Sequence, residues 1–363
     1  MYALGIHLGS LTTQAVYIDS LGDSGRLTDL EEGRSYPIPS WVALDGFGSL
    51  TGYAALRLRS SESPPALIRF AREALLVDKA TLANADQPRT ADEIGVLLLN
   101  KVLRDLPSLR RDDLFVALTV PDGMSDQRRQ QMHEIWRGVG LQNLAFLEDS
   151  VAVLNAANNR AALSGNTFLS LVFDEDALKI SLLRRQASEF TVSAHTVIEA
   201  VSLLAIRNAL AEAVTRDAKL LTSGHDVVEP AELEDCWYRH GDAFIGHCAD
   251  APQTAFSREL ILRYGNRYLT LIFTPAALDE SLDAQRRMLE SRLLEFAQRH
   301  AGPSIDQAIC TGKLGRLLNA SGLLQKTLGL RPDAITIQPD TALAHGAALY
   351  AARIDNNTRA AGK

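Results

Sequence analysis

The opening stretch, residues 2–17, constrains the fold more than any other part of the sequence. It reads YALGIHLGSLTTQAVY: an apolar strand, a turn of glycine and hydroxyl residues, and a second strand. Such a turn, with Gly9, Ser10, Thr12 and Thr13, can direct backbone N–H groups and hydroxyls toward an anion. His7 stands beside it, where a phosphate-handling site ordinarily carries a carboxylate that organises hydrated Mg²⁺. On its own, His7 is interpreted as a half-buried strand histidine with a satisfied hydrogen bond.

Composition limits the class of protein. The chain has 363 residues, 46% of them hydrophobic and 22% charged, and at about 150 residues per domain this length predicts two units. The net charge of −7 provides no basic surface for nucleic acid, so a nucleic-acid partner is not expected.

Cysteine usage and hydropathy predict a cytoplasmic protein. Three cysteines in so long a chain form no disulfide framework. No apolar run reaches the roughly 18 residues of a membrane span, and the N-terminus has no basic leader segment. We therefore expect no membrane association and no signal peptide.

Hydrophobic periodicity predicts alternating strands and helices. After the opening hairpin, strands are expected near 36–44, 114–121, 144–147, 168–174, 178–183, 190–195, 260–273 (a hairpin) and 308–312. Helices are expected over 66–77, 90–106, 125–138, 151–163, 198–221, 230–244, 274–300, 314–328 and 339–354, with a disordered tail over 355–363.

Eight fragments, in order, resemble the ATPase domain of the 70-kDa heat-shock (DnaK-type) chaperones, within the actin/hexokinase-like superfamily. The first, GIHLGS at residues 5–10, is similar to the family's first phosphate loop, G-I-D-L-G-T. The last, QPDTALAHGAA at 338–348, is close to N-P-D-E-A-V-A-Y-G-A-A. Those between are PSWVA at 39–43, VP at 120–121 with QRRQ at 127–130, GL at 140–141, EDSVAVL at 148–154, VFD at 172–174 and TGK at 311–313.

The resemblance implies an α/β, two-lobed, actin-like (ribonuclease H-like) fold with a central cleft. Lobe I is expected over 1–163, lobe II over 164–338, and the helix 339–354 is expected to return to lobe I. The resemblance further implies that Glu148 is a general base or holds metal-bound water, and that Asp174 is the aspartate of the second phosphate loop. Nucleotide contacts are implied for His7, Gly9, Ser10, Leu11, Gly312, Lys313 and Asp340.

Departures from the family pattern point to lost catalysis, because phosphoryl transfer depends on positioning and charge neutralisation. His7 replaces the first-loop aspartate, and Ser10 replaces a threonine. The family's helix lysine falls near Ala71, while Arg72 is predicted to lie on another helical face. Residues 175–177, Glu-Asp-Ala, replace the second loop's leucine and glycines. Each like-charge encounter there, at ~4 Å and a dielectric of about 20, costs about 4 kcal/mol, so polyphosphate should be repelled.

The preferred hypothesis is a pseudo-ATPase acting as a protein-binding or scaffolding module, with weak or absent affinity for ATP, ADP and Mg²⁺. No peptide-binding domain follows residue 354 in the sequence. The alternative is a weak ATPase or small-molecule kinase that uses Glu148 and Asp174. A third interpretation is an actin-like polymerising protein.

Two other patterns were weighed against simpler structural roles. Cys236, His240, His247 and Cys248 crowd one stretch, but their spacing is not that of a zinc site, so no metal is expected. The charge-rich segment 279–295 is interpreted as a solvated helix face. No G-x-S-x-G motif supports a Ser-His-Asp hydrolase.

Overall fold

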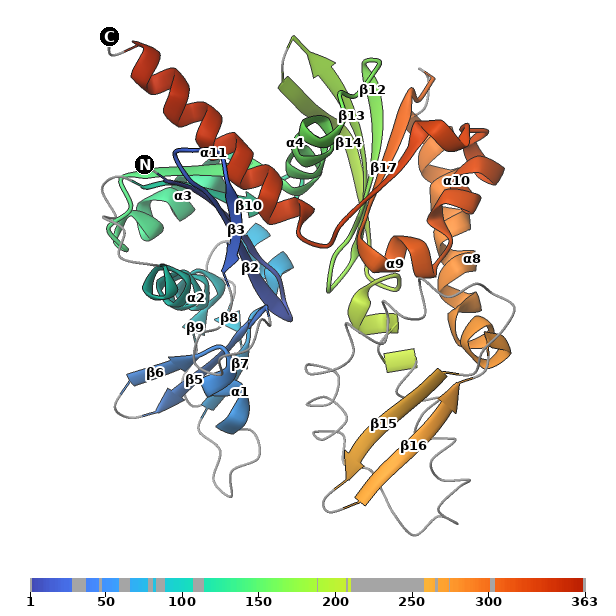
Figure 1. Ribbon diagram of the computed structural model, residues 1–363, viewed down its shortest axis with the longest axis horizontal. Coiled ribbons are helices and arrows are strands. Elements are labelled where there is room, and N and C mark those ends of the chain that lie inside the picture. The colour runs from blue at the N-terminus through green and yellow to red at the C-terminus, as the bar shows by residue number, and fades with distance from the viewer. Residues whose placement is uncertain are drawn as a thin grey trace.

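Two mixed β-sheets organise the part of the chain that the structure describes (Figure 1). The computed structural model describes residues 2–27, 37–45, 48–58, 66–77, 81–82, 89–106, 114–187, 189–206, 208–209, 258–264, 267–273, 275–300 and 304–361. In the first sheet the strands follow the order β11-β10-β1-β2-β3, with β4 paired to β2. In the second the order is β14-β13-β12-β17-β18. The protein is therefore mixed α/β, as the sequence predicts.

The strand bounds follow the apolar runs of the sequence. The first sheet consists of β1 (Tyr2–Leu8), β2 (Thr12–Ile18), β3 (Ser24–Leu27), β4 (Ile38–Pro39), β10 (Leu114–Val120) and β11 (Asn143–Glu148). The second consists of β12 (Thr167–Phe173), β13 (Leu178–Gln186), β14 (Glu189–Ile198), β17 (Gln307–Thr311) and β18 (Ile335–Gln338). Smaller sheets are formed by β5 (Trp41–Asp45), β6 (Gly48–Thr51) and β7 (Ala66–Arg69), by β8 (Thr81–Leu82) and β9 (Arg89–Thr90), and by β15 (Arg258–Tyr264) and β16 (Arg267–Phe273).

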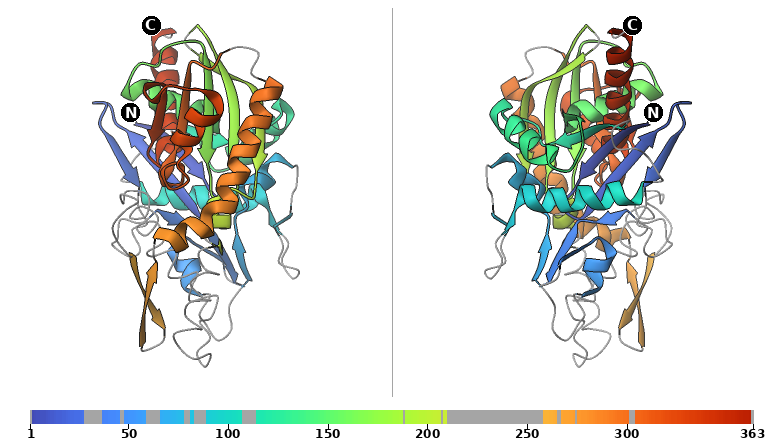
Figure 2. Two further views of the ribbon diagram at one scale, coloured as in Figure 1. Left: turned by 90° about the vertical axis from the view of Figure 1, so that its right-hand side faces the viewer. Right: turned by 90° about the vertical axis from the view of Figure 1, so that its left-hand side faces the viewer.

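The helices pack around these sheets. They are α1 (Tyr53–Arg57), α2 (Ala91–Asp105), α3 (Asp126–Arg137), α4 (Asp149–Arg160), α8 (Pro275–His300), α9 (Gly312–Leu317), α10 (Ala320–Leu328) and α11 (Ala342–Ala361), with 3₁₀ helices η3 (Arg72–Leu76) and η6 (Pro332–Ala334). None of the described helices is long and apolar enough to cross a membrane. Both chain ends lie at one end of the molecule, opposite the β15–β16 hairpin (Figures 1 and 2).

Several predicted elements are confirmed. The hairpin across residues 175–177 and the third strand beside it are β12, β13 and β14, which pair in succession. The predicted helix 90–106 is α2, and a capping box starts it: Glu93 N donates to Thr90 Oγ1 at 3.2 Å, and Thr90 N donates to Glu93 Oε2 at 2.8 Å. Each of these two bonds satisfies a backbone N–H group that would lack a partner at an uncapped helix start.

Two helices, α4 and α11, join the sheets through small residues. α11 packs on β1, β2 and β10, and it also packs on α4, which contacts β12 and β17. A Cβ placed on Gly5 of β1 would lie 2.0 Å from Ala344 O, and one on Gly346 would lie 1.8 Å from Ala152 O. The absence of side chains at these two positions therefore sets how closely α11 approaches both β1 and α4.

The prediction of a helix over 66–77 is wrong. Residues 66–69 form β7, which pairs with β5 through Ile68 and Val42, and 72–76 form η3. Burial alternates along this segment, with Ile68, Phe70 and Arg72 inside. This alternation has the two-residue period of a strand. A search for buried positions that counts only apolar residues misses it, because its last buried member is an arginine.

Three other boundaries differ from the sequence predictions. The helix expected over 314–328 is divided into α9 and α10 at Asn319, whose left-handed backbone (φ 54°) ends one helix while its side chain caps the next. The tail expected to be disordered from Asp355 continues α11 to Ala361, because no glycine or proline interrupts the segment. Strand β14 extends to Ile198, where the helix 198–221 was expected to begin, and the described helical residues that follow are 203–206 and 208–209.

The predicted helix 230–244 and the Cys236–Cys248 stretch lie outside the described residues. The hairpin and the long helix after them are present as β15, β16 and α8.

Candidate functional site

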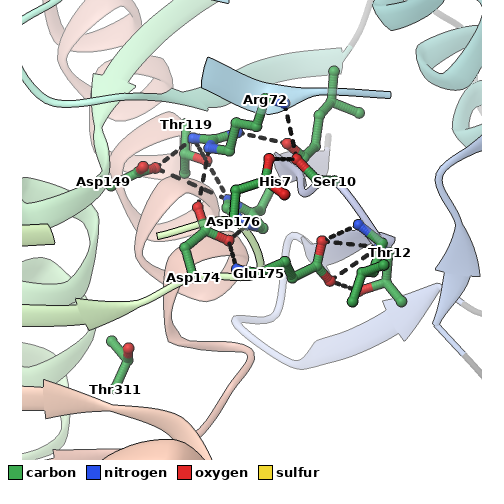
Figure 3. A network of polar contacts seen from close by, with 12 residues as sticks. His7, Ser10, Thr12, Arg72, Thr119, Asp149, Asp174, Glu175, Asp176 and Thr311 are labelled. Carbon is green, nitrogen blue, oxygen red and sulfur yellow. Dashed lines mark hydrogen bonds and ion pairs between the residues drawn. The ribbon is translucent and has the colours of Figure 1, made fainter. Parts of the chain in front are cut away.

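The turn between β1 and β2 is filled by acidic side chains from the turn between β12 and β13 (Figure 3). The Glu175 carboxyl group accepts hydrogen bonds from Thr12 N at 2.9 and 3.0 Å, from Thr12 Oγ1 at 2.6 Å and from Leu11 N. Ser10 Oγ donates to Asp176 Oδ2. The donors that were predicted to face an anion therefore face carboxyl groups of the chain itself.

Gly9 makes this approach possible. A Cβ at this position would lie 2.5 Å from Glu175 Oε2 and 2.6 Å from Thr12 O. The turn is closed by a hydrogen bond from Gly9 N to Thr12 O at 3.0 Å. A glycine is thus needed at residue 9 so that the carboxyl group can reach the backbone.

Burial changes the protonation of both acidic residues. Burial and, second to it, the neighbouring Asp174 raise the pKa of Glu175 to about 8, against the lowering effect of the bonds from Thr12 and Leu11. Burial likewise raises the pKa of Asp176, against the hydrogen bond from Ser10. In either protonation state the Glu175 oxygens can accept the turn's hydrogen bonds.

A buried ion cluster lies next to these turns. Lys179 Nζ, on β13, lies 2.7 Å from Asp149 Oδ2, 3.0 Å from Asp174 Oδ2 and 3.0 Å from Glu73 Oε1. The side chains of Lys179, Asp149 and Asp174 are 1%, 0% and 4% exposed. Burial alone would lower the pKa of Lys179, but Asp149 and Asp174 raise it above its ordinary value, so the ammonium stays charged.

Arg72 completes the cluster from the other side. Its Nη2 pairs with Asp149 Oδ1, and its Nε lies 3.4 Å from Asp174 Oδ2. It also donates to Leu8 O at 2.7 Å and to Thr119 Oγ1 at 3.1 Å, while its backbone N donates to Ser10 Oγ at 2.9 Å.

The position predicted for Arg72 was therefore wrong. The sequence analysis assigned it to another face of a helix than Ala71, but Ala71 is extended (φ −116°, ψ 106°) and no α-helix forms here, so the chain directs the guanidinium inward. Two cations set the pKa values of both carboxylates: burial alone would raise these values, but Lys179 and Arg72 keep them low.

His7 is fully buried, at 2% exposure, rather than half-buried as predicted. Its Nδ1 lies 2.9 Å from Thr119 Oγ1, and its Nε2 lies 3.4 Å from Asp174 Oδ1. Burial and the nearby Arg72 lower the pKa of His7, so the ring is neutral at neutral pH. The structure thus brings His7 and Asp174 together.

Glu148 lies apart from this cluster. Its carboxyl group pairs with Arg129 at 3.0 Å and accepts a bond from Gly123 N at 3.4 Å, and burial raises its pKa. Among the described residues, no hydrogen bond or ion pair joins Glu148 to Asp174. Its sequence neighbour Asp149, at the first position of α4, takes the place beside Asp174.

The third group of predicted residues gathers at the end of β17. Gly312 has φ +70°, and a Cβ there would lie 2.2 Å from Asp340 Oδ1. The same oxygen accepts from Lys313 N at 3.0 Å, and Lys313 Nζ lies 3.8 Å from Asp340 Oδ2. As at the first turn, a carboxylate of the chain itself accepts the hydrogen bond of a backbone N–H group.

The sequence analysis did not identify four members of the ion cluster: Arg72, Glu73, Asp149 and Lys179. A usable signal was present for Lys179, which interrupts the apolar run of residues 177–183, because a lysine inside a buried strand needs a charged partner. In the described part of the chain, no group of three or more His, Cys, Asp or Glu side chains could hold a metal ion. Comparison with models of protein families and with curated proteins found no match.

Proposed function

We propose that this chain is a degenerate ATPase domain of the DnaK type, with a two-lobed actin-like fold, that binds a protein partner and does not hydrolyse nucleotide. One observation carries the proposal: the Glu175 carboxyl group accepts the hydrogen bonds of Leu11 and Thr12 in the first turn. In the DnaK-type resemblance, this turn is the first phosphate loop.

A nucleotide phosphate would have to displace Glu175 from these donors. Displacement would leave a buried carboxyl group without its three donors, and an unsatisfied buried polar group costs about 1–3 kcal/mol, more if it is charged. Asp176, on the hydroxyl of Ser10, adds a second obstacle of the same kind.

The catalytic side of the site supports the same conclusion. The neutral His7 ring cannot act as the carboxylate that organises metal-bound water. Asp174 is already paired with Lys179 and approached by Arg72, so its charge is neutralised within the chain. The alternative of a weak ATPase or kinase requires Glu148 and Asp174 to act on one substrate, and Glu148 contacts Arg129 and Gly123 instead.

Titration calorimetry with ATP, with ADP and with each plus Mg²⁺ tests the proposal, alongside a turnover assay. We expect no measurable turnover and weak or absent binding by the natural chain. The double variant Glu175→Ala/Asp176→Ala frees the turn and should bind nucleotide at least about tenfold more tightly, a gain of about 1.4 kcal/mol.

The matched control is Asp283→Ala/Glu290→Ala on α8, which removes the same two carboxyl groups, an aspartate and a glutamate, from a helix where they are 49% and 29% exposed. It should leave nucleotide affinity unchanged. Hydrolysis by the natural chain that is abolished by Glu148→Ala or Asp174→Ala would overturn the proposal. A pull-down with the natural chain then identifies the protein partner.

A further inference from the structure

We infer that Lys179 is a built-in cation: its ammonium takes the place of a divalent metal ion within a three-carboxylate site formed by Glu73, Asp149 and Asp174. The inference concerns the cation and goes beyond the proposed function, because it holds whether or not the chain is related to an ATPase.

The geometry around Lys179 Nζ is the first step. Three carboxylate oxygens lie within 2.7–3.0 Å of this one atom. They come from three separate places: Glu73 from η3, Asp149 from the first turn of α4, and Asp174 from the end of β12. One positive centre thus holds together segments that no local sequence pattern connects, which is what a bound metal ion does in other proteins.

The charges around Lys179 also suit a divalent cation. Without Lys179, the three carboxylates and the Arg72 guanidinium would carry a net charge of −2. A divalent cation would neutralise that charge, and oxygen-only ligands of this kind suit Mg²⁺, Ca²⁺ and Mn²⁺. With the ammonium in place, no room is left for such an ion at the centre of the three oxygens, which agrees with the finding that no group of described acidic or histidine side chains in the natural chain could hold a metal ion.

Arg72 and the burial of the carboxylates define the surroundings of this site. Arg72 Nε is buried, has no hydrogen-bond partner among the described residues, and is directed at Asp174. The Arg72 guanidinium is thus held to Asp149 and Asp174 by ion pairs of its own, and the position of the Lys179 ammonium remains to be filled by a separate cation. The side chains of Asp149 and Asp174 are buried, so few water molecules would compete with these carboxylates for a bound ion.

Removing the ammonium tests the inference, with the metal ion alone as probe and no nucleotide present. Lys179→Ala should lower the melting temperature of the chain in EDTA. Adding millimolar Mg²⁺, Ca²⁺ or Mn²⁺ should raise it again by several degrees, with apparent affinities on the order of 10⁻⁴–10⁻³ M. The natural chain and Lys179→Arg, which keeps a positive charge, should show no metal-dependent shift.

The matched control is Lys101→Ala, because Lys101 is also a buried lysine that forms an ion pair with an aspartate, Asp105, at 3.2 Å. This variant should lose stability without any response to metal. Equal responses of Lys179→Ala and Lys101→Ala would overturn the inference. If Lys179→Ala does not fold when expressed, it is refolded from denaturant with Mn²⁺ or with EDTA; recovery only with metal supports the inference, and failure in both, with Lys101→Ala refolding normally, overturns it.

These outcomes are separable from those of the proposed function. A metal response in Lys179→Ala can occur in a chain that hydrolyses ATP, and its absence can occur in one that does not. The two experiments use different variants and different ligands.

Discussion

Thr12 Oγ1 lies 2.6 Å from Oε1 of Glu175, across 163 positions of sequence. The hydrogen bond ties the turn after β1 to the turn after β12, and these two strands are in different sheets. Because Glu175 is a buried acid, the stability of this contact between the two sheets should depend on pH.

The first prediction concerns that link. Burial raises the pKa of Glu175 from 4.5 to about 8, so between these values the folded chain keeps a proton that the unfolded chain has released. The free energy of unfolding should then fall as the pH rises through this interval, by on the order of 5 kcal/mol at most from this group. Glu175→Gln cannot ionise and should remove this part of the pH dependence.

Urea unfolding at about pH 5 and about pH 9 measures it. The groups that face Glu175 are Asp174, Asp176 and the donors of the first turn, so the comparison of the variant with the natural chain isolates residue 175. Glu290→Gln, at an exposed ion pair with Lys326, serves as control and should leave the slope unchanged. A pH dependence identical in the natural chain and in Glu175→Gln would contradict the assignment.

The second prediction separates two adjacent acids. Asp149→Asn removes the partner of both Lys179 and Arg72 in a fully buried site, and should lower the free energy of unfolding by about 3–5 kcal/mol. Glu148→Gln affects a partly exposed pair with Arg129, and should cost less than about 1 kcal/mol. Denaturant titration of the two variants checks this, and equal losses would show that Asp149 is not the anchor of the cluster.

The third prediction concerns the packing of α11. A Cβ on Gly346 would lie 1.8 Å from Ala152 O of α4, and backbone atoms cannot move aside as a flexible side chain can. Gly346→Ala should therefore cost more than about 4 kcal/mol or prevent folding. Gly48→Ala, which meets nothing within 4 Å and has an ordinary backbone φ, should be neutral or stabilising by up to about 1 kcal/mol. Thermal unfolding or soluble yield distinguishes the two variants, and a stable Gly346→Ala would show that α4 and α11 are farther apart.

Local patterns were enough to predict many of the elements. The opening hairpin, the helix over 90–106 and the β12–β13–β14 meander each follow from residues that are close in sequence. The segment 66–77 could not be predicted in the same way, since its strand alternation ends on Arg72, a residue that buries only because Asp149 and Asp174 neutralise it.

The candidate site shows where prediction from sequence ends. Residue order alone indicated that the first turn faces an anion, that His7 stands where a carboxylate would be expected, and that Glu175 and Asp176 place carboxyl groups beside it. Only the tertiary structure decided that these carboxyl groups sit on the turn's own donors rather than merely near them. It also decided that Asp149, and not Glu148, joins Asp174 around Lys179. The physical reason is that hydrogen bonds and ion pairs depend on distances of about 3 Å between atoms, and residues far apart in the chain reach those distances only after the two sheets and α4 have packed together.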